Sequence, residues 1–265
     1  MNVICFAIFG QLENPLMSKN ITSLKQYKIE YAKSIKDPAA FWEEKAEKFT
    51  WYKKWSKVLS WDFTKPEVKW FEGGKLNITE NCLDRHLVNK GNQTAIKWVA
   101  NNPKEATRNI SYKELYTEVC KFANVLKNNG GKKGDRICLY MPMIPELAIA
   151  VLACARIGAI HSVVFAGFSA KSLSDRINDA DCNILITSDG GFRGAKITPL
   201  KDISNEAMKT TPSIEKCIVL ERTKNTISMK NGRDFWWHDE MQKVTSTCPI
   251  EIMDAEAPLF ILYTS

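Results

Sequence analysis

The chain has 265 residues, of which 45% are hydrophobic and 25% are charged. This composition is typical of a globular protein with one large or two small domains, and it excludes a disordered or fibrous chain. The net charge of +7 comes from lysines and arginines scattered among acidic residues, without a basic block. The charge therefore argues against nucleic acid or an anionic membrane as a partner, and favours a small ligand that carries phosphate.

The eight cysteines form no C-x-x-C pair and have no histidine at zinc-finger spacing. Cys138 and Cys154 lie within apolar runs, so we expect reduced thiols in the core of a cytoplasmic protein and no metal site. Residues 1–16 contain an apolar run that is too short to span a membrane and lacks the charge of a signal peptide. We interpret residues 1–16 as a misannotated leader and Met17 as the true start.

Residues 17–92 form a tryptophan-rich segment ahead of the main domain. Asp37 and Pro38 predict the start of a helix, because Asp caps helices and Pro suits their first position. We interpret the five tryptophans as packing anchors rather than ligand-stacking groups: Trp42, Trp51, Trp55, Trp61 and Trp70. The sequence predicts a helical extension that packs on the main domain, which we assign to residues 93–265.

From residue 94 onward, strand-like and helix-like segments alternate. Ser111 and Glu114 predict a capping box, and the glycines at 130 and 131 predict the end of the helix that follows it. We expect the strands at 95–99, 136–141, 160–164, 183–187 and 216–220, and further helices at 146–157 and 169–180. This alternation predicts an α/β fold with a parallel sheet and right-handed crossovers. Residues 222–234 are expected to form a polar surface hairpin or loop.

Three segments that follow strands stand out, because ligands of open parallel sheets bind beyond the carboxyl ends of the strands. The first is the small-residue turn Phe165–Gly167, and the second is the glycine-rich run 187–196, in which Arg193 and Lys196 could bring two cations to a phosphate. The third is 259–265, which we interpret as a strand buried on both faces that runs into a loop. Each segment alone also suits an ordinary turn or surface loop.

Together with their surroundings, these segments resemble the acetyl-CoA synthetases, acyl-CoA ligases of the adenylate-forming superfamily. The resemblance runs from about Tyr27 to Ser265. Its motifs stand in the expected order, at residues 37–42 (DPAAFW), 81–86 (NCLDRH), 110–115 (ISYKEL), 140–146 (YMPMIPE), 153–159 (ACARIGA) and 161–165 (HSVVF). By resemblance the chain is the first part of the large amino-terminal domain, a truncated parallel-sheet unit.

The resemblance implies a ligase that makes acetyl-CoA from acetate, ATP and coenzyme A through acetyl-adenylate, with Mg²⁺ as the metal of ATP. It implies that Phe165, Ala166, Gly167, Arg193, Gly194, Ala195 and Lys196 contact coenzyme A, and that Thr264 and Ser265 open the loop around the ATP phosphates. Many family members carry glycine where Ala166 stands and arginine where Lys196 stands. The family's catalytic lysine matches no residue here, and we assign no metal ligand, so we expect no adenylation by this chain alone.

Alternatives remain open at this point. A propionyl-CoA or other short-chain acyl-CoA synthetase would share these motifs, because the acid pocket matches no residue of the chain. Outside the enzymes, the chain could be a non-catalytic coenzyme A-binding module or a degenerate remnant without a ligand. His86 and His161 lie in apolar segments, where we expect satisfied structural histidines rather than acid–base groups. An unpaired sheet edge would lower solubility, and the oligomeric state is not predicted.

Overall fold

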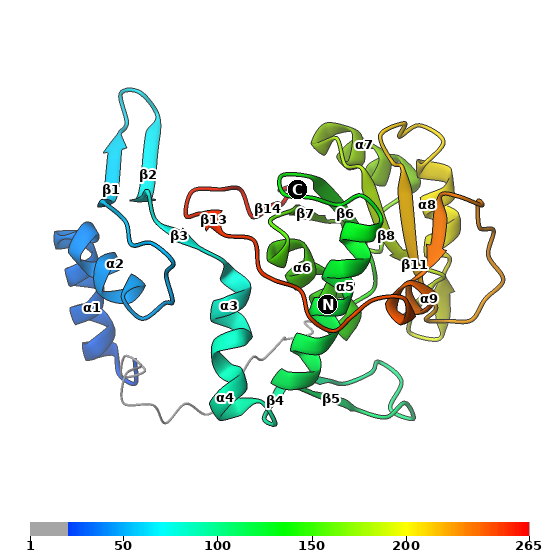
Figure 1. Cartoon of the computed structure of the whole chain (residues 1–265), viewed down its shortest axis with the longest axis horizontal. Coiled ribbons are helices and arrows are strands. Elements are labelled where there is room, and N and C mark those ends of the chain that lie inside the picture. Colours follow the sequence, from blue (N-terminus) through cyan, green and yellow to red (C-terminus); the bar gives the residue numbers. More distant parts are fainter. Residues whose placement is uncertain (1–20, 265) are drawn as a thin grey trace.

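The structure, a computed structural model, describes residues 21–264 (Figure 1). Its centre is a six-stranded sheet in the order β12-β11-β8-β6-β7-β14, in which all neighbours are parallel. The bounds of these strands are β6 (Arg136–Tyr140), β7 (Ile160–Val163), β8 (Ile184–Ser188), β11 (Lys216–Leu220), β12 (Asp234–Trp236) and β14 (Phe260–Ile261). The parallel sheet and the α/β fold that the sequence predicts are confirmed.

Helices cover both faces of this sheet, with α5, α6 and α9 on one face and α7 and α8 on the other. Their bounds are α5 (Tyr112–Asn128), α6 (Pro145–Arg156), α7 (Ala170–Ala180), α8 (Leu200–Ala207) and α9 (Trp237–Gln242). Successive strand residues point to opposite faces, so Ile137 and Leu139 enter the first core while Cys138 and Tyr140 enter the second. Burial on both faces explains why the central strands are rich in apolar residues.

The predicted helix starts and ends are confirmed in this region. The Ser111 hydroxyl accepts a hydrogen bond from the Glu114 N–H at 3.2 Å, and the Glu114 carboxylate accepts one from the Ser111 N–H at 2.8 Å. Gly130, with a φ of +90°, adopts the left-handed conformation beyond the end of α5. Ser169 caps α7 by accepting a hydrogen bond from the Ser172 N–H. These local signals fix where the crossover helices begin and end.

The last strand differs from its prediction. Residues 259–263 were expected to form a strand buried on both faces, but β14 contains only Phe260 and Ile261 and is an edge strand. Phe260 is 54% exposed and Leu262 is 69% exposed. The prediction of two-sided burial is wrong among the described residues, because Phe260 and Leu262 are exposed. In addition, only β7 pairs with β14, so the other edge of β14 has no described partner.

The amino-terminal region lies to one side of the sheet (Figure 1). It contains α1 (Leu24–Lys36), α2 (Pro38–Ala46), β1 (Lys57–Asp62) and β2 (Glu67–Glu72). The predicted helix start is confirmed, since the Asp37 side chain accepts a hydrogen bond from the Ala40 N–H and Pro38 opens α2. The prediction of a helical extension is incomplete, because β1 and β2 pair as an antiparallel hairpin. Residues 1–16 and Met17 lie outside the described part of the chain.

The remaining short elements lie outside the six-stranded sheet. Their bounds are β3 (Lys75–Leu76), α3 (Ile78–Cys82), α4 (Leu87–Lys90), β4 (Thr94–Trp98), β5 (Arg108–Ser111), β9 (Gly191–Arg193), β10 (Lys196–Thr198) and β13 (Met253–Asp254). The strand predicted at 95–99 exists as β4, but it pairs antiparallel with β5 and stays outside the parallel sheet. The predicted loop 222–234 is confirmed up to Asp234, which is buried and starts β12. The division at residues 92 and 93 stays a prediction.

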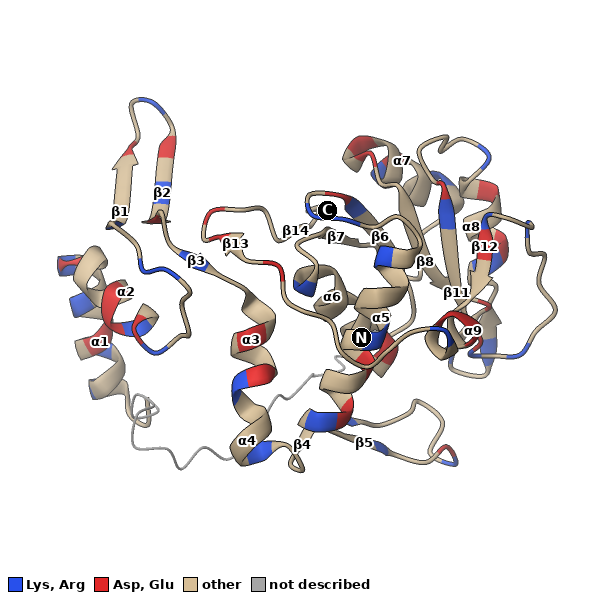
Figure 2. Ribbon diagram, in the orientation of Figure 1, with Lys and Arg blue, Asp and Glu red and all other residues tan. Residues whose placement is uncertain are grey.

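Charged residues of both signs are interspersed over both regions (Figure 2). Among residues 21–264, no helix has the length and apolar content needed to cross a membrane.

Candidate functional site

The three segments that the sequence singles out follow strands of the parallel sheet. Because β6, β7, β8 and β14 run in the same direction, their carboxyl ends lie along one edge. The turn Phe165–Gly167 follows β7, the run 189–196 follows β8, and Thr264 follows β14. The three segments thus share the edge at which ligands of such sheets bind.

The turn after β7 is held by the side chain of Tyr140, the last residue of β6. The Tyr140 hydroxyl donates a hydrogen bond to the Phe168 carbonyl at 2.7 Å and lies 3.5 Å from the carbonyl oxygen of Ala166. Burial raises the pKa of Tyr140 to about 12, so the phenol keeps its proton at neutral pH. A Cβ at Gly167 would lie 2.3 Å from the ring of the exposed Phe165, so a larger residue there would displace that ring. The turn presents exposed residues beside the start of α7.

Arg193 and Lys196 face each other in the hairpin of β9 and β10. Gly194 has a φ of +60°, a left-handed conformation that glycine adopts without strain, and Ala195 completes the turn. All four residues are exposed. Two cations therefore stand side by side on the surface, at a separation that the hairpin register sets.

The base of the hairpin depends on Asp189, which the sequence analysis did not single out. Asp189 is 1% exposed, and its carboxylate accepts hydrogen bonds from four backbone N–H groups. The donors are Gly190 at 2.6 Å, Arg222 at 2.7 Å, Thr223 at 3.0 Å and Lys224 at 2.6 Å. A buried carboxylate is tolerated only with such partners. Asp189 thus joins the loop after β8 to the loop after β11, a contact between segments about 30 residues apart that has no local sequence signal.

Arg176 of α7 links the turn after β7 to the end of the described chain. Its guanidinium lies 4.6 Å from the Phe168 ring centroid and 5.3 Å from that of Tyr263. The Tyr263 hydroxyl donates a hydrogen bond to the Asp179 carboxylate at 2.6 Å. Burial and this hydrogen bond raise the pKa of Tyr263 to about 12. Stacking on both rings holds the segment that carries Thr264 against α7.

The structure thus brings two of the three segments together. Phe168 and Tyr263 share Arg176, so the turn Phe165–Gly167 and the exposed Thr264 lie beside the same helix. The hairpin with Arg193 and Lys196 follows β8, and β6 separates β8 from β7. Ser265 lies outside the described residues.

His161 does not match its prediction as a satisfied histidine. It is buried in β7, and its Nδ1 has no hydrogen-bond partner among the described residues. Burial lowers its pKa to about 4, so the imidazole is neutral at physiological pH. His86 lies at the surface of the core with its ring 5.1 Å from that of Tyr112. Neither histidine lies in one of the three segments.

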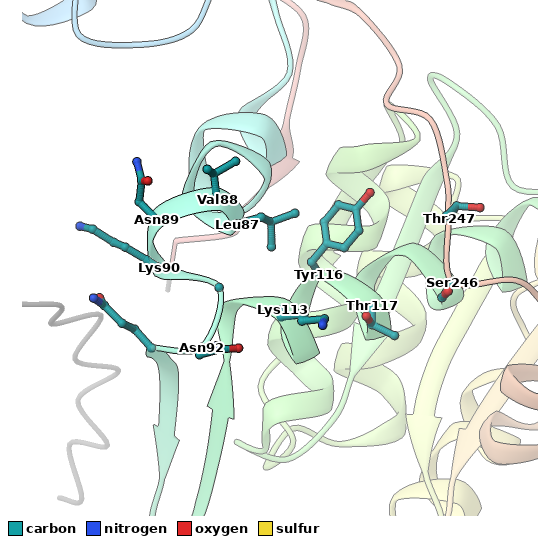
Figure 3. A pocket seen from close by; sticks show the side chains of 12 residues that line it. Leu87, Val88, Asn89, Lys90, Asn92, Lys113, Tyr116, Thr117, Ser246 and Thr247 are labelled. Atoms are coloured by element: carbon teal, nitrogen blue, oxygen red, sulfur yellow. The ribbon is translucent and has the colours of Figure 1, made fainter.

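Two hollows of about 690 and 580 Å³ lie elsewhere in the described chain. The larger is lined by residues of α4, α5 and the segment 246–247 (Figure 3). None of the predicted site residues lines either hollow. Within residues 21–264, no three His, Cys, Asp or Glu side chains gather as a metal site. The candidate residues lie instead along the sheet edge, where all of them except the half-buried Ala166 are exposed among the described residues.

Comparisons with known proteins agree with this architecture. The family model described as "AMP-binding enzyme" matches residues 83–265, and the one described as "Acetyl-coenzyme A synthetase N-terminus" matches residues 27–82. The acetoacetyl-CoA synthetase from Streptomyces lividans superposes with a TM-score of 0.79 at 25% identity, over 87% of this chain and 35% of that one.

Sequence relatives agree as well. An acetyl-coenzyme A synthetase of Bdellovibrio bacteriovorus is 54% identical over 241 residues, which are 91% of this chain and 37% of the relative. Acetyl-coenzyme A synthetase 2 of Pseudomonas aeruginosa is 51% identical over 90% of this chain and 37% of its own length. The chain thus spans a little over a third of these relatives. It belongs to the AMP-binding enzyme family, and its residues 27–82 carry the amino-terminal segment of acetyl-coenzyme A synthetases.

Proposed function

We propose that the chain is part of an acetate–CoA ligase, and that its own contribution is to bind coenzyme A. The observation that carries the proposal is the 54% identity, over 91% of the chain, to a relative named acetyl-coenzyme A synthetase. In the first step of this reaction the acetate carboxylate attacks the α-phosphate of ATP, which gives acetyl-adenylate and releases diphosphate. In the second step the coenzyme A thiol attacks the acetyl carbonyl carbon, which gives the thioester and releases AMP.

The exposed turn and hairpin have the chemistry that coenzyme A requires. Coenzyme A carries phosphates at its nucleotide end, and Arg193 and Lys196 offer two adjacent cations to them. Arg193 can bind a phosphate with two parallel hydrogen bonds, whereas Lys196 acts as a point charge. Gly167 is exposed and carries no side chain, which favours the close approach of a ligand to the backbone beside the start of α7.

Thr264 and Ser265 are proposed to open the loop that surrounds the ATP phosphates. Thr264 is exposed at the sheet edge, next to the segment that Tyr263 holds on α7. Mg²⁺ is expected to accompany ATP, but residues 21–264 gather no cluster of ligands for it, so none of them is assigned to the metal. Because the chain spans 37% of its relatives, we expect no acetate-dependent ATP–diphosphate exchange by the chain alone. The cytoplasmic location stays a prediction.

Calorimetric titration of the chain with coenzyme A tests the proposal. We expect saturable binding that weakens about tenfold or more in Arg193→Ala and in Lys196→Ala, since a charge-assisted hydrogen bond contributes about 1.5–3 kcal/mol. Lys127→Ala, which removes an exposed cation at the end of α5, is the matched control and should bind as the parent does. Binding that is absent in the parent chain, or equally strong in all variants, would contradict the proposal.

A further inference from the structure

Arg222, in the loop after β11, contacts the hairpin that carries the two cations. Its guanidinium lies 4.9 Å from the ring centroid of Phe192 in β9 and 5.4 Å from that of Trp98 in β4. Its Nη2 donates to a carboxylate oxygen of Glu105 at 2.8 Å. The side chain is therefore held by two aromatic rings and one acid, from three separate parts of the chain.

One of these partners is a rigid platform. Trp98 is 6% exposed, and its indole N–H donates to the carbonyl oxygen of Met143, in the turn after β6, at 3.0 Å. Phe192, in contrast, is 44% exposed and belongs to the hairpin. Through its planar guanidinium, Arg222 therefore joins the exposed β9–β10 hairpin to the buried Trp98.

The backbone of Arg222 is fixed on its other side. Its N–H donates to the buried Asp189 carboxylate, which also receives the Gly190 N–H at the base of the hairpin. A Cβ at Gly190 would lie 2.5 Å from Thr223 Oγ1 and 2.9 Å from Ile197 Cγ2, so the loop and the hairpin are in close contact there. The two attachments, through Asp189 and through Phe192, lie at the base and along the first strand of the hairpin.

The hairpin needs such support because β9 and β10 pair only with each other. An isolated two-stranded hairpin is marginally stable in water, and this one has three residues in each strand. Phe192 and Ile197, the middle residues of its two strands, are exposed, so the burial of their side chains contributes little to its stability. Contacts at its base and along its first strand therefore contribute to its order.

We propose that Arg222 is a positioning residue that holds the β9–β10 hairpin in place and so presets Arg193 and Lys196 for an anionic ligand. The part about the ligand rests on the proposed coenzyme A function. Arg222 itself contacts Trp98, Phe192 and Glu105. Its planar guanidinium is what the arrangement requires, because it can stack on rings and pair with a carboxylate at the same time.

The chain offers a matched control in Arg108 of β5. Its guanidinium also lies over the Trp98 ring, at 6.0 Å, and it also pairs with an acid, Glu146, at 2.8 Å. Phe192 is the contact that distinguishes the two arginines. Arg108→Ala therefore removes a similar stacked ion pair at the same tryptophan and leaves the attachment of the hairpin intact.

The first test needs no ligand. Hydrogen–deuterium exchange of the whole chain is compared for the parent, Arg222→Ala and Arg108→Ala. We expect the amides of residues 191–198 to exchange about tenfold faster in Arg222→Ala, with the amides of β6 and β8 unchanged. Arg108→Ala should leave residues 191–198 as in the parent. Unchanged exchange of the hairpin in Arg222→Ala, or equal acceleration in both variants, would overturn the proposal.

The second test measures coupling to the cations. We expect Arg222→Ala to weaken coenzyme A binding about five- to tenfold, and Arg222→Lys, which keeps the charge, to restore part of it. When Arg222→Ala is added to the double variant Arg193→Ala, Lys196→Ala, it should cause no further loss of coenzyme A affinity. The two cations through which Arg222 acts are absent from that variant. A full additional loss there would show that Arg222 acts by another route. If the parent chain binds no coenzyme A, the proposed function fails, while the exchange experiment still decides whether Arg222 positions the hairpin.

Discussion

The sheet region and the amino-terminal region are stabilised in different ways. In β6 and β8, the residues from Ile137 to Tyr140 and from Leu185 to Ile186 are all completely buried. In α1, by contrast, no residue is buried, and α2 buries only Ala46. Apolar area removed from water is the main favourable term in folding. The comparison teaches that the free energy of unfolding resides in the sheet and its covering helices, on which the candidate site is built.

Aromatic side chains hold the amino-terminal region together without forming a second core. Trp51 lies 4.9 Å from Trp55 and 5.5 Å from Phe71, and Trp42 lies 6.3 Å from Trp70, as ring centroids. These tryptophans therefore pack on one another, as expected of anchors, yet Trp42 remains exposed. Trp61 is 59% exposed near the end of the hairpin and does not fit the anchoring prediction.

Two polar side chains join the regions. Asn77, which is buried, donates its side-chain N–H groups to the carbonyl oxygens of Ala155 at 3.0 Å and Glu251 at 2.7 Å. Arg156, at the end of α6, pairs with Asp84 through both terminal nitrogens, at 2.9 and 3.1 Å. Hydrogen bonds thus contribute to the connection between the regions, alongside the apolar Leu83, which is buried in the core with α5 and α6.

The largest effect is expected inside the sheet region, at the buried ion pair of Lys201 and Asp234. Both side chains are fully buried, and Lys201 Nζ lies 2.8 Å from the Asp234 carboxylate. Lys201→Met should lower the free energy of unfolding by about 3–4 kcal/mol, the lower part of the range for breaking a buried pair, because Arg233 still pairs with Asp234. Urea unfolding measures this change.

The exposed pair of Lys171 and Asp175 in α7 is the control for that experiment. Lys171→Met should change the free energy of unfolding by less than about 0.5 kcal/mol, since the pair is solvated. Equal losses in the two variants would show that burial does not distinguish them.

A smaller effect is expected from His161, through pH. Its pKa is lowered to about 4 in the folded chain, so the unfolded chain binds more protons at mildly acid pH. The free energy of unfolding should therefore decrease as the pH falls from about 7 to about 4.5, by about 2–3 kcal/mol from this group alone. His161→Gln should lose that part of the pH dependence, as measured by urea unfolding across this range.

The exposed His238 is the control here, and His238→Gln should keep the pH dependence of the parent. A pH profile of His161→Gln that runs parallel to that of the parent would contradict the assigned burial of the neutral imidazole.

The smallest effect is expected in the amino-terminal region. Leu24 in α1 is 68% exposed, so Leu24→Ala should change the free energy of unfolding by less than about 0.5 kcal/mol. Leu139→Ala in β6, which is completely buried, should cost at least about 2 kcal/mol by comparison. Similar midpoints of thermal unfolding for these two variants would remove the distinction between the regions.

Elements with local signals could be predicted from the sequence. The capping box of Ser111 and Glu114, the Asp37–Pro38 helix start and the apolar run at 216–220 all appear where expected. Their causes lie within a few residues, as caps and buried strands require. The sequence does not predict the hairpin of β1 and β2. Apolar and polar residues alternate only weakly along these two strands, and the turn between them is exposed.

The position of the candidate residues at the sheet edge was predictable, but the contacts that support them were not. Arg193 and Lys196 stand out as cations in a glycine-rich run, and β8 places that run at the sheet edge. Asp189, Arg222 and Arg176 act through partners far away in the chain, which no local pattern reveals. The exposure of β14 also depends on which neighbours a strand has, a property of the whole sheet.

The most direct test of the coenzyme A site is hydrogen–deuterium exchange of the chain with and without coenzyme A. The account predicts slower exchange at two separate segments, 165–168 and 191–198, and unchanged exchange in the amino-terminal residues 24–72. Slower exchange at only one of the two segments would mean that only that segment contacts coenzyme A. Protection confined to residues 24–72, or bound coenzyme A that protects neither segment, would contradict the account.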